Sequence, residues 1–85
     1  MHFVKEIERV EPFKLYLKFE DGSLRLINME EKLLEWSKDS KSIYKRLLNP
    51  DYFRQVKLNK ELETIYWDNG VDFCPEVLYK WSENN

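Results

Sequence analysis

The chain has 85 residues, of which 35% are charged, with a net charge of -2 at pH 7 and a single cysteine. This length fits one domain over residues 1–85, and one cysteine excludes an internal disulfide. No apolar run is long enough to cross a membrane. The N-terminal residues do not fit a signal peptide, and a single cysteine excludes a disulfide-stapled secreted scaffold, so we expect a protein of the reducing cytoplasm. The slightly acidic balance argues against a general nucleic-acid binder.

The N-terminal residues predict a β-strand with an irregularity. Residues 2–10 are rich in β-branched side chains, which favour strands. Val4, Ile7 and Val10 recur at every third residue, however, where a regular strand would alternate. A β-bulge would reconcile that spacing with a strand.

The next residues predict a hairpin that completes a three-stranded meander. Lys14–Phe19 alternates apolar and polar side chains, the pattern of a half-buried strand. Asp21-Gly22 predicts the turn, because glycine accepts a positive φ. Residues 24–27 then return as a third strand, with Leu24 and Leu26 expected on the buried face.

Two short helices are predicted after the meander. Asn28 is a good N-cap residue, and Met29, Leu33 and Trp36 lie on one face of the helix that would follow it. Ile43–Leu48 predicts a second helix, since its apolar side chains pair at i,i+4 spacing.

The last third predicts two strands and a closing helix. Residues 54–58 and 64–67 read as strands, and Asn69-Gly70 predicts a tight turn between the second of them and a return to the core. Pro75 fits the first position of a final helix, where its missing N–H costs nothing. The expected fold is therefore α+β, with a small antiparallel sheet of about five strands and two to three short helices.

A motif near the C-terminus points to a family. The pattern W-D-N-G-x-D-x-C-P-E-x-L-Y spans residues 67–79, after L-x-L-x-F-x-D-G at 15–22 and L-L-N-P-x-x-F at 47–53. In this order the motifs resemble the DUF2442 family of small bacterial domains. Cys74 departs from the pattern, which usually has a small hydroxyl residue there. The resemblance implies an α+β fold and no established activity; some relatives are encoded beside a small toxin-like protein.

Asp68, Asp72 and Cys74 are the candidates for chemistry. The two carboxylates could serve acid–base work or bind a divalent ion, and a thiol before a helix could be a nucleophile. We favour a structural interpretation: Asp68 starts the turn, Asp72 caps the last helix and Cys74 is a small, partly buried side chain. His2 is the only imidazole, so no catalytic residue, metal site or cofactor is predicted.

Charge and aromatic residues allow two further hypotheses. Residues 38–60 hold seven basic and two acidic side chains, which suits either nucleic-acid binding or a solvated face. Trp67, Tyr79 and Trp81 could line a binding surface or fill the core.

We expect a non-catalytic protein-interaction module that binds a protein partner or itself, with the antitoxin-like member of a bacterial two-gene pair as the finer expectation. Nucleic-acid binding through residues 38–60 and a minor enzyme using Asp68, Asp72 and Cys74 are the alternatives. The candidate interaction or structural signature consists of Trp67, Asn69, Gly70, Asp72, Pro75, Tyr79 and Trp81.

Overall fold

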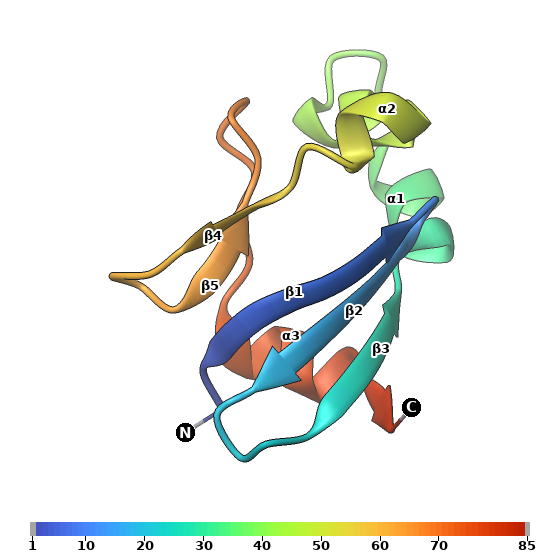
Figure 1. Cartoon of the computed structure of the whole chain (residues 1–85). Coiled ribbons are helices and arrows are strands. Elements are labelled where there is room, and N and C mark those ends of the chain that lie inside the picture. Colours follow the sequence, from blue (N-terminus) through green and yellow to red (C-terminus); the bar gives the residue numbers. More distant parts are fainter. Residues whose placement is uncertain (1, 85) are drawn as a thin grey trace.

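The computed structural model describes residues 2–84, whose strands form two antiparallel sheets (Figure 1). The strands are β1 (Val4–Glu11), β2 (Lys14–Phe19), β3 (Leu24–Asn28), β4 (Lys57–Asn59), β5 (Thr64–Tyr66) and β6 (Glu83–Asn84). The larger sheet has the order β1-β2-β3-β6, and the smaller one pairs β4 with β5. The predicted α+β class is confirmed, but the strands divide between two sheets because β4 and β5 pair only with each other.

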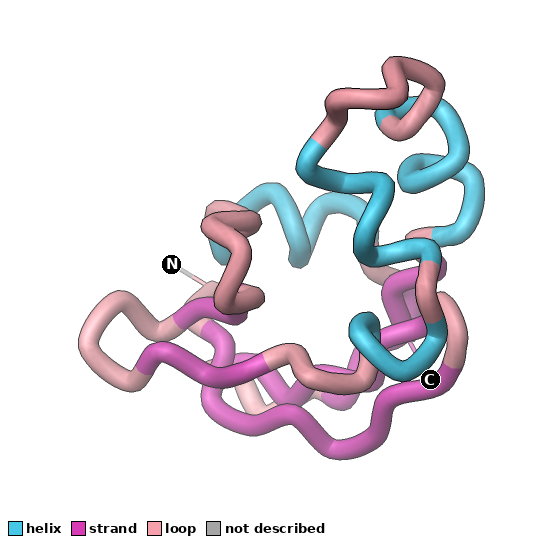
Figure 2. The backbone as a smooth tube through the Cα atoms, turned by 90° about the horizontal axis from the view of Figure 1, so that it is seen from above, coloured by secondary structure: helices cyan, strands magenta, loops and turns pink. Residues whose placement is uncertain are grey.

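The helices form two groups, with the last helix in the chain apart from the other three (Figures 1 and 2). They are α1 (Glu30–Trp36), the 3-10 helix η1 (Ile43–Leu48), α2 (Pro50–Phe53) and α3 (Pro75–Trp81). Helix α3 crosses behind β2 and β3, while α1, η1 and α2 gather beyond one end of the sheet. The core between these layers consists of Val4, Leu15, Leu17, Phe19, Ile27, Met29, Leu33, Leu47, Phe53, Ile65, Trp67, Val71 and Leu78.

Strand β1 contains the irregularity that its sequence predicted. Its pairing with β2 shifts between Val4 and Glu6 and again between Ile7 and Arg9. Each shift inserts an extra residue, so side chains three apart in sequence reach the same face of the sheet. Val4 is buried, and Ile7 and Val10 pack against the core.

The expected burial of Leu24 and Leu26 in β3 is wrong. Ile27 is the buried residue and pairs with Leu15, while Leu24 is 37% exposed. The cause is the turn, in which Phe19 N–H donates to the Ser23 carbonyl at 3.0 Å. The loop is therefore one residue longer than a two-residue Asp-Gly turn, and a shift of one residue exchanges the two faces of a strand.

Helix starts follow the predicted capping chemistry in part. Asn28 Oδ1 accepts the Glu30 N–H at 3.1 Å, although the N-cap position itself is Met29. Helix α3 begins at Pro75 as predicted and buries Leu78, whereas Val77 is 37% exposed. Within residues 2–84 no helix is long and apolar enough to span a membrane.

Candidate functional site

The Trp67 side chain is part of the core. Its ring is 1% exposed, and its Nε1–H donates to the Phe53 carbonyl at 3.0 Å. Its backbone N–H donates to the Val71 carbonyl at 2.8 Å, which closes the predicted turn. Gly70 occupies that turn at φ +98°, a conformation that costs other residues about 1–2 kcal/mol. These two signature residues therefore shape the fold.

Asn69 fastens the same turn to the helices. Its Nδ2 donates to the Ile43 carbonyl at 3.0 Å, and its backbone N–H donates to the Tyr52 hydroxyl at 3.0 Å. Its Oδ1 accepts the Val71 N–H at 3.2 Å. One amide side chain thus joins the turn to η1, and the backbone beside it joins the turn to α2.

The two aspartates and the cysteine have separate environments. Lys57 Nζ donates to Asp68 Oδ2 at 2.8 Å. Asp72 is exposed and forms a single antiparallel bridge with Tyr66. The predicted cap by Asp72 is wrong: Cys74 holds the N-cap position of α3, without a side-chain bond to the helix. Val71 and Phe73 turn toward the core, so the residue between them faces solvent.

Cys74 also differs from expectation, because it is exposed rather than partly buried. Neither of the two hollows described below is lined by Asp68, Asp72 or Cys74. Among the residues that the structure describes, no three His, Cys, Asp or Glu side chains are placed to hold a metal ion.

Tyr79 joins α3 to the β2–β3 hairpin and to the N-terminal residues. Its ring stacks on the His2 ring with centroids 3.6 Å apart, and the Arg25 guanidinium lies 4.3 Å from its centre. Its hydroxyl donates to Asp21 Oδ2 at 2.9 Å. Hydrogen bonds from Ser23, with a smaller contribution from Tyr79, lower the pKa of Asp21 to about 2.

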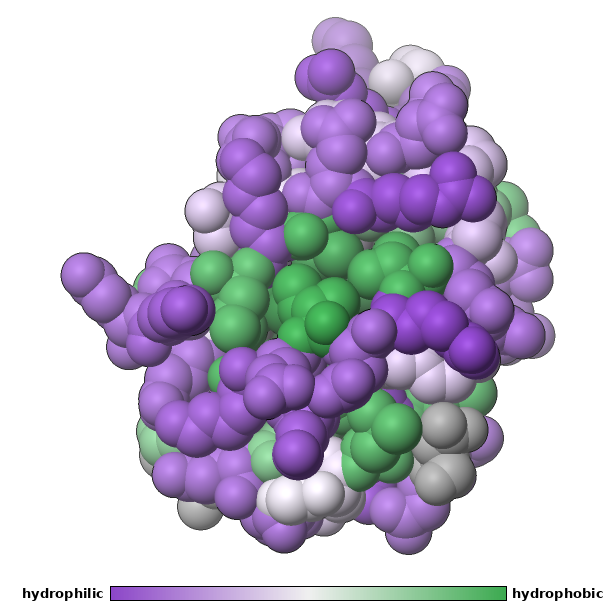
Figure 3. Space-filling model, viewed as in Figure 1, coloured by the Kyte–Doolittle hydropathy of each residue, from purple (hydrophilic) through white to green (hydrophobic). Residues whose placement is uncertain are grey.

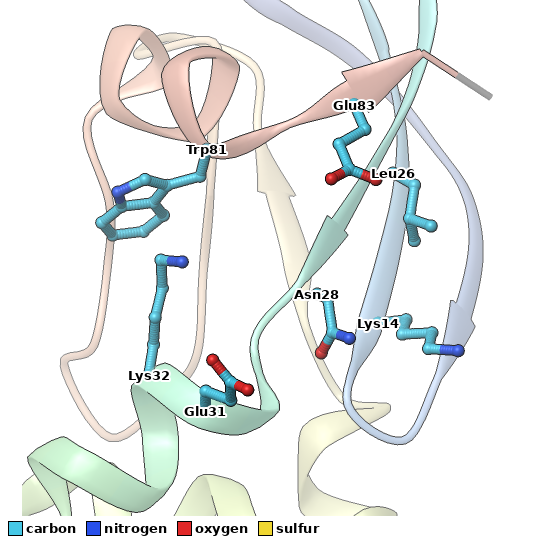
Figure 4. A pocket seen from close by; sticks show the side chains of 7 residues that line it. All are labelled: Lys14, Leu26, Asn28, Glu31, Lys32, Trp81 and Glu83. Atoms are coloured by element: carbon cyan, nitrogen blue, oxygen red, sulfur yellow. The ribbon is translucent and has the colours of Figure 1, made fainter.

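Trp81 is half-buried at the side of a polar groove (Figure 4). Its ring centroid lies 5.7 Å from those of Trp36 and Phe73, and Lys32 Nζ lies 4.9 Å from it. The groove has a volume of about 350 Å³ and is lined by Lys14, Leu26, Asn28, Glu31, Lys32, Trp81 and Glu83. The lining carries two ammonium groups and two carboxylates, so its formal charges cancel.

A second surface lies between β1 and the β4–β5 hairpin. The two meet where Val4 N–H donates to the Glu63 carbonyl at 2.9 Å, and they diverge from there toward α2 (Figure 1). At the narrow end is a hollow of about 210 Å³ lined by Val4, Lys5, Leu58, Lys60 and Glu63. We call the surface between β1 and residues 56–58 the β1–β4 wedge.

The β1–β4 wedge is apolar beyond its narrow end, where the charged Lys5, Lys60 and Glu63 line the hollow. Its partly buried apolar side chains are Ile7 and Val10 on the β1 side and Val56 and Leu58 on the other, all packed against the core. Figure 3, in the view of Figure 1, shows apolar atoms gathered at the surface between these two segments and polar atoms on both sides. An exposed apolar area rimmed by polar groups is typical of a binding surface.

Over residues 4–84 the chain matches the family described as protein of unknown function DUF2442. The chain belongs to the DUF2442 family. No curated protein and no solved structure gives a significant match. In this DUF2442 domain the W-D-N-G pattern has a structural role. It forms the turn that Trp67 and Asn69 connect to the helices through hydrogen bonds.

The basic segment of this DUF2442 domain is partly neutralised. Lys38 pairs with Glu35 at 2.9 Å, Arg54 with Asp51 at 3.2 Å, and Lys57 with Asp68 at 2.8 Å. Such exposed pairs are weak, but they reduce the field available to a phosphate backbone. Binding of nucleic acid by residues 38–60 stays a prediction.

Sequence reasoning did not single out the β1–β4 wedge. The available signal was the three-residue spacing of Val4, Ile7 and Val10, which marks a strand with two bulges. What the sequence could not reveal is that β4 and β5 leave the outer edge of β1 unpaired over most of its length, because strand pairing depends on contacts between distant segments.

Proposed function

We propose that this DUF2442 domain is a non-catalytic protein-interaction module and that its partner binds at the β1–β4 wedge. The supporting observation is an apolar surface beside a strand edge whose hydrogen-bonding groups are open over most of its length. Apolar burial supplies affinity, and an open strand edge supplies directional hydrogen bonds.

The candidate residues for chemistry fit this proposal. Asp68 is held in an ion pair with Lys57, while Asp72 and Cys74 are exposed and line neither of the two hollows described above. General acid–base or nucleophilic catalysis needs such groups within hydrogen-bond reach of one another or of one reacting atom.

The finer part of the proposal is that the partner is the toxin-like product of a neighbouring bacterial gene, which this domain binds in the cytoplasm. That part is supported by the family resemblance alone. It also gives the search for a partner a starting point, because the neighbouring product can be coexpressed and tested directly.

Copurification with matched variants tests the proposal. The tagged protein is recovered from its native host, and a retained protein is identified by mass spectrometry and bound again after separate purification. Ile7→Thr with Val10→Thr keeps β-branched side chains but makes the β1–β4 wedge polar. Leu34→Ser with Leu62→Ser changes apolar residues that are 55% and 63% exposed elsewhere.

We expect the wild type and the Leu34/Leu62 variant to retain the partner and the Ile7/Val10 variant to lose it. Recovery of the protein alone at every salt concentration, together with no binding to the neighbouring gene product, would contradict the proposed function.

A further inference from the structure

The outer edge of β1 is open along most of its length. Within residues 2–84, Val4 is the one β1 residue whose backbone is hydrogen-bonded toward β4 and β5. From Glu6 to Glu11 the strand pairs with β2 alone. The outward backbone N–H and C=O groups of such a strand are a template for another extended chain.

The two bulges make this edge selective. Bulges twist a strand edge and hinder indiscriminate pairing, so a partner needs side chains that match. They also bring both Ile7 and Val10 to the apolar side of β1, next to the β1–β4 wedge. A matching segment would place alternate apolar side chains there.

The unpaired charge at this edge is negative. Lys5 pairs with Glu63, and Arg9 pairs with Glu11 at 3.6 Å while lying over the Tyr16 ring. Glu6 and Glu8 have no cation within 4.0 Å among the described residues. Hydrogen bonding to the Glu6 carboxyl is the main cause that raises the pKa of Glu8, and the charge of Lys18, opposite Glu6 on β2, acts against it.

Of the cations on the other side of the β1–β4 wedge, two are paired with carboxylates, whereas Lys60 has no acidic partner within 4.0 Å among the described residues. Arg54 pairs with Asp51, and Lys57 pairs with Asp68. A ligand that lies along residues 6–11 therefore meets uncompensated acidic charge on β1, while the unpaired Lys60 lines the hollow at the narrow end of the β1–β4 wedge.

We infer that residues 6–11 of β1 bind an extended segment of another protein in which apolar side chains alternate with lysine or arginine. This inference rests on the proposed function and names its mode and partner chemistry. The segment's backbone bonds to β1, its apolar side chains enter the β1–β4 wedge, and its cations neutralise Glu6 and Glu8. About six residues, roughly 20 Å of extended chain, cover this edge.

A second copy of the chain fits the edge less well. Its own β1 would bring another Glu6 and Glu8, which have no cation partner in the copy either, and like charges opposite each other destabilise strand pairs. The charge pattern therefore favours a different protein over a homodimer.

The test uses ¹⁵N-labelled protein and synthetic peptides of alternating valine and lysine. Matched peptides carry glutamate in place of lysine, or carry N-methyl groups on alternate backbone nitrogens so that they cannot pair as a strand. We expect the lysine peptide to shift the amide signals of residues 6–11 in a saturable way and to slow their hydrogen exchange. The other two peptides should bind about tenfold more weakly or not at all.

Charge-swapped variants make the test specific. Glu6→Lys with Glu8→Lys should reverse the preference toward the glutamate peptide. Glu35→Lys with Glu61→Lys changes the net charge equally at two other exposed positions and should leave the preference unchanged.

Three results would overturn the inference. These are equal binding of the N-methylated peptide, signal changes centred away from β1, and a stable homodimer in sedimentation that buries residues 6–11. Binding of the natural partner distinguishes an error in this inference from an error in the proposed function. If the partner still binds the Glu6/Glu8 variant, the domain is an interaction module that does not use this edge. If no partner is found, the proposed function itself is wrong.

Discussion

The Arg25 guanidinium lies 4.3 Å from the centre of the Tyr79 ring, which places a cation–π contact between β3 and α3. The same guanidinium donates to the Ser82 carbonyl at 3.3 Å and to Asn84 Oδ1 at 2.8 Å. Arg25 therefore holds α3 and β6 against the sheet, from a position where the hairpin pattern predicted a solvent-facing side chain.

Replacing Arg25 by alanine should lower the free energy of unfolding by about 1–2 kcal/mol, because a cation–π contact and charged hydrogen bonds are lost together. Urea unfolding followed by tryptophan fluorescence measures this. Arg9→Ala is the matched control, since Arg9 lies 4.2 Å from the Tyr16 ring but is 61% exposed. Its cost should stay below about 1 kcal/mol. Equal losses for the two variants would contradict the role given to Arg25.

Protonation of the Asp21 carboxylate should lower the free energy of unfolding at low pH. Its pKa is about 2 in the fold, lowered from 3.8 mainly by the hydrogen bonds from Ser23. A lowered folded-state pKa stabilises the protein above pH 3.8, and this stability is lost as the pH falls toward 2. Asp21→Asn should flatten the unfolding free energy over that interval. A variant whose unfolding free energy still falls as steeply as that of the wild type between pH 3.8 and 2 would contradict this role of Asp21.

Two tryptophan substitutions should differ sharply. Trp67→Phe removes a buried ring and the hydrogen bond to the Phe53 carbonyl, so it should cost about 2–4 kcal/mol. Trp81→Phe changes a half-buried ring at the groove and should cost less than about 1.5 kcal/mol. Chemical denaturation followed by far-UV circular dichroism compares them. A larger loss for Trp81 would show that the core is centred elsewhere.

The turn around Asn69 should be sensitive to small changes. Asn69→Ala removes both side-chain hydrogen bonds, to Ile43 and from Val71, at a cost of about 1–2 kcal/mol. Asn69→Asp keeps an acceptor for Val71 but loses the donor to Ile43, so its melting temperature should fall between those of the alanine variant and the wild type. An aspartate variant as unstable as the alanine variant would indicate that the bond from Val71 contributes nothing.

Asp72 and Cys74, two of the candidate residues for catalysis, should tolerate substitution. Asp72→Asn and Cys74→Ser each alter an exposed side chain, so each should change stability by less than about 0.5 kcal/mol. Both variants should also retain the copurified partner at the wild-type level. Loss of an activity of the purified protein in either variant, with the fold intact, would restore the enzyme alternative.

Local patterns predicted much of this fold. Two-residue alternation located β2, the bulge in β1 followed from apolar spacing, and Pro75 marked the start of α3. These features depend on neighbouring residues, so the sequence shows them directly. Short motifs at residues 15–22, 47–53 and 67–79 likewise indicated the family, and the match over residues 4–84 confirmed it.

The errors came from choices that local patterns leave open. One extra residue in the Asp21-Gly22 turn moved Arg25 inward. Asp72 forms a backbone bridge with Tyr66, and the N-cap position of α3 falls on Cys74 instead. The division into two sheets depends on how far β4 and β5 stand from β1. Binding surfaces that arise from such long-range placement, like the β1–β4 wedge, are therefore hidden from a single sequence.

Hydrogen–deuterium exchange on the complex with the copurified partner tests the central claim most directly. The account predicts slower exchange of the backbone amides of residues 6–11 in the complex, with little change in the Asn69 turn or at the groove beside Trp81. Protection confined to residues 38–60 or to the groove, with residues 6–11 exchanging as in the free protein, would contradict it.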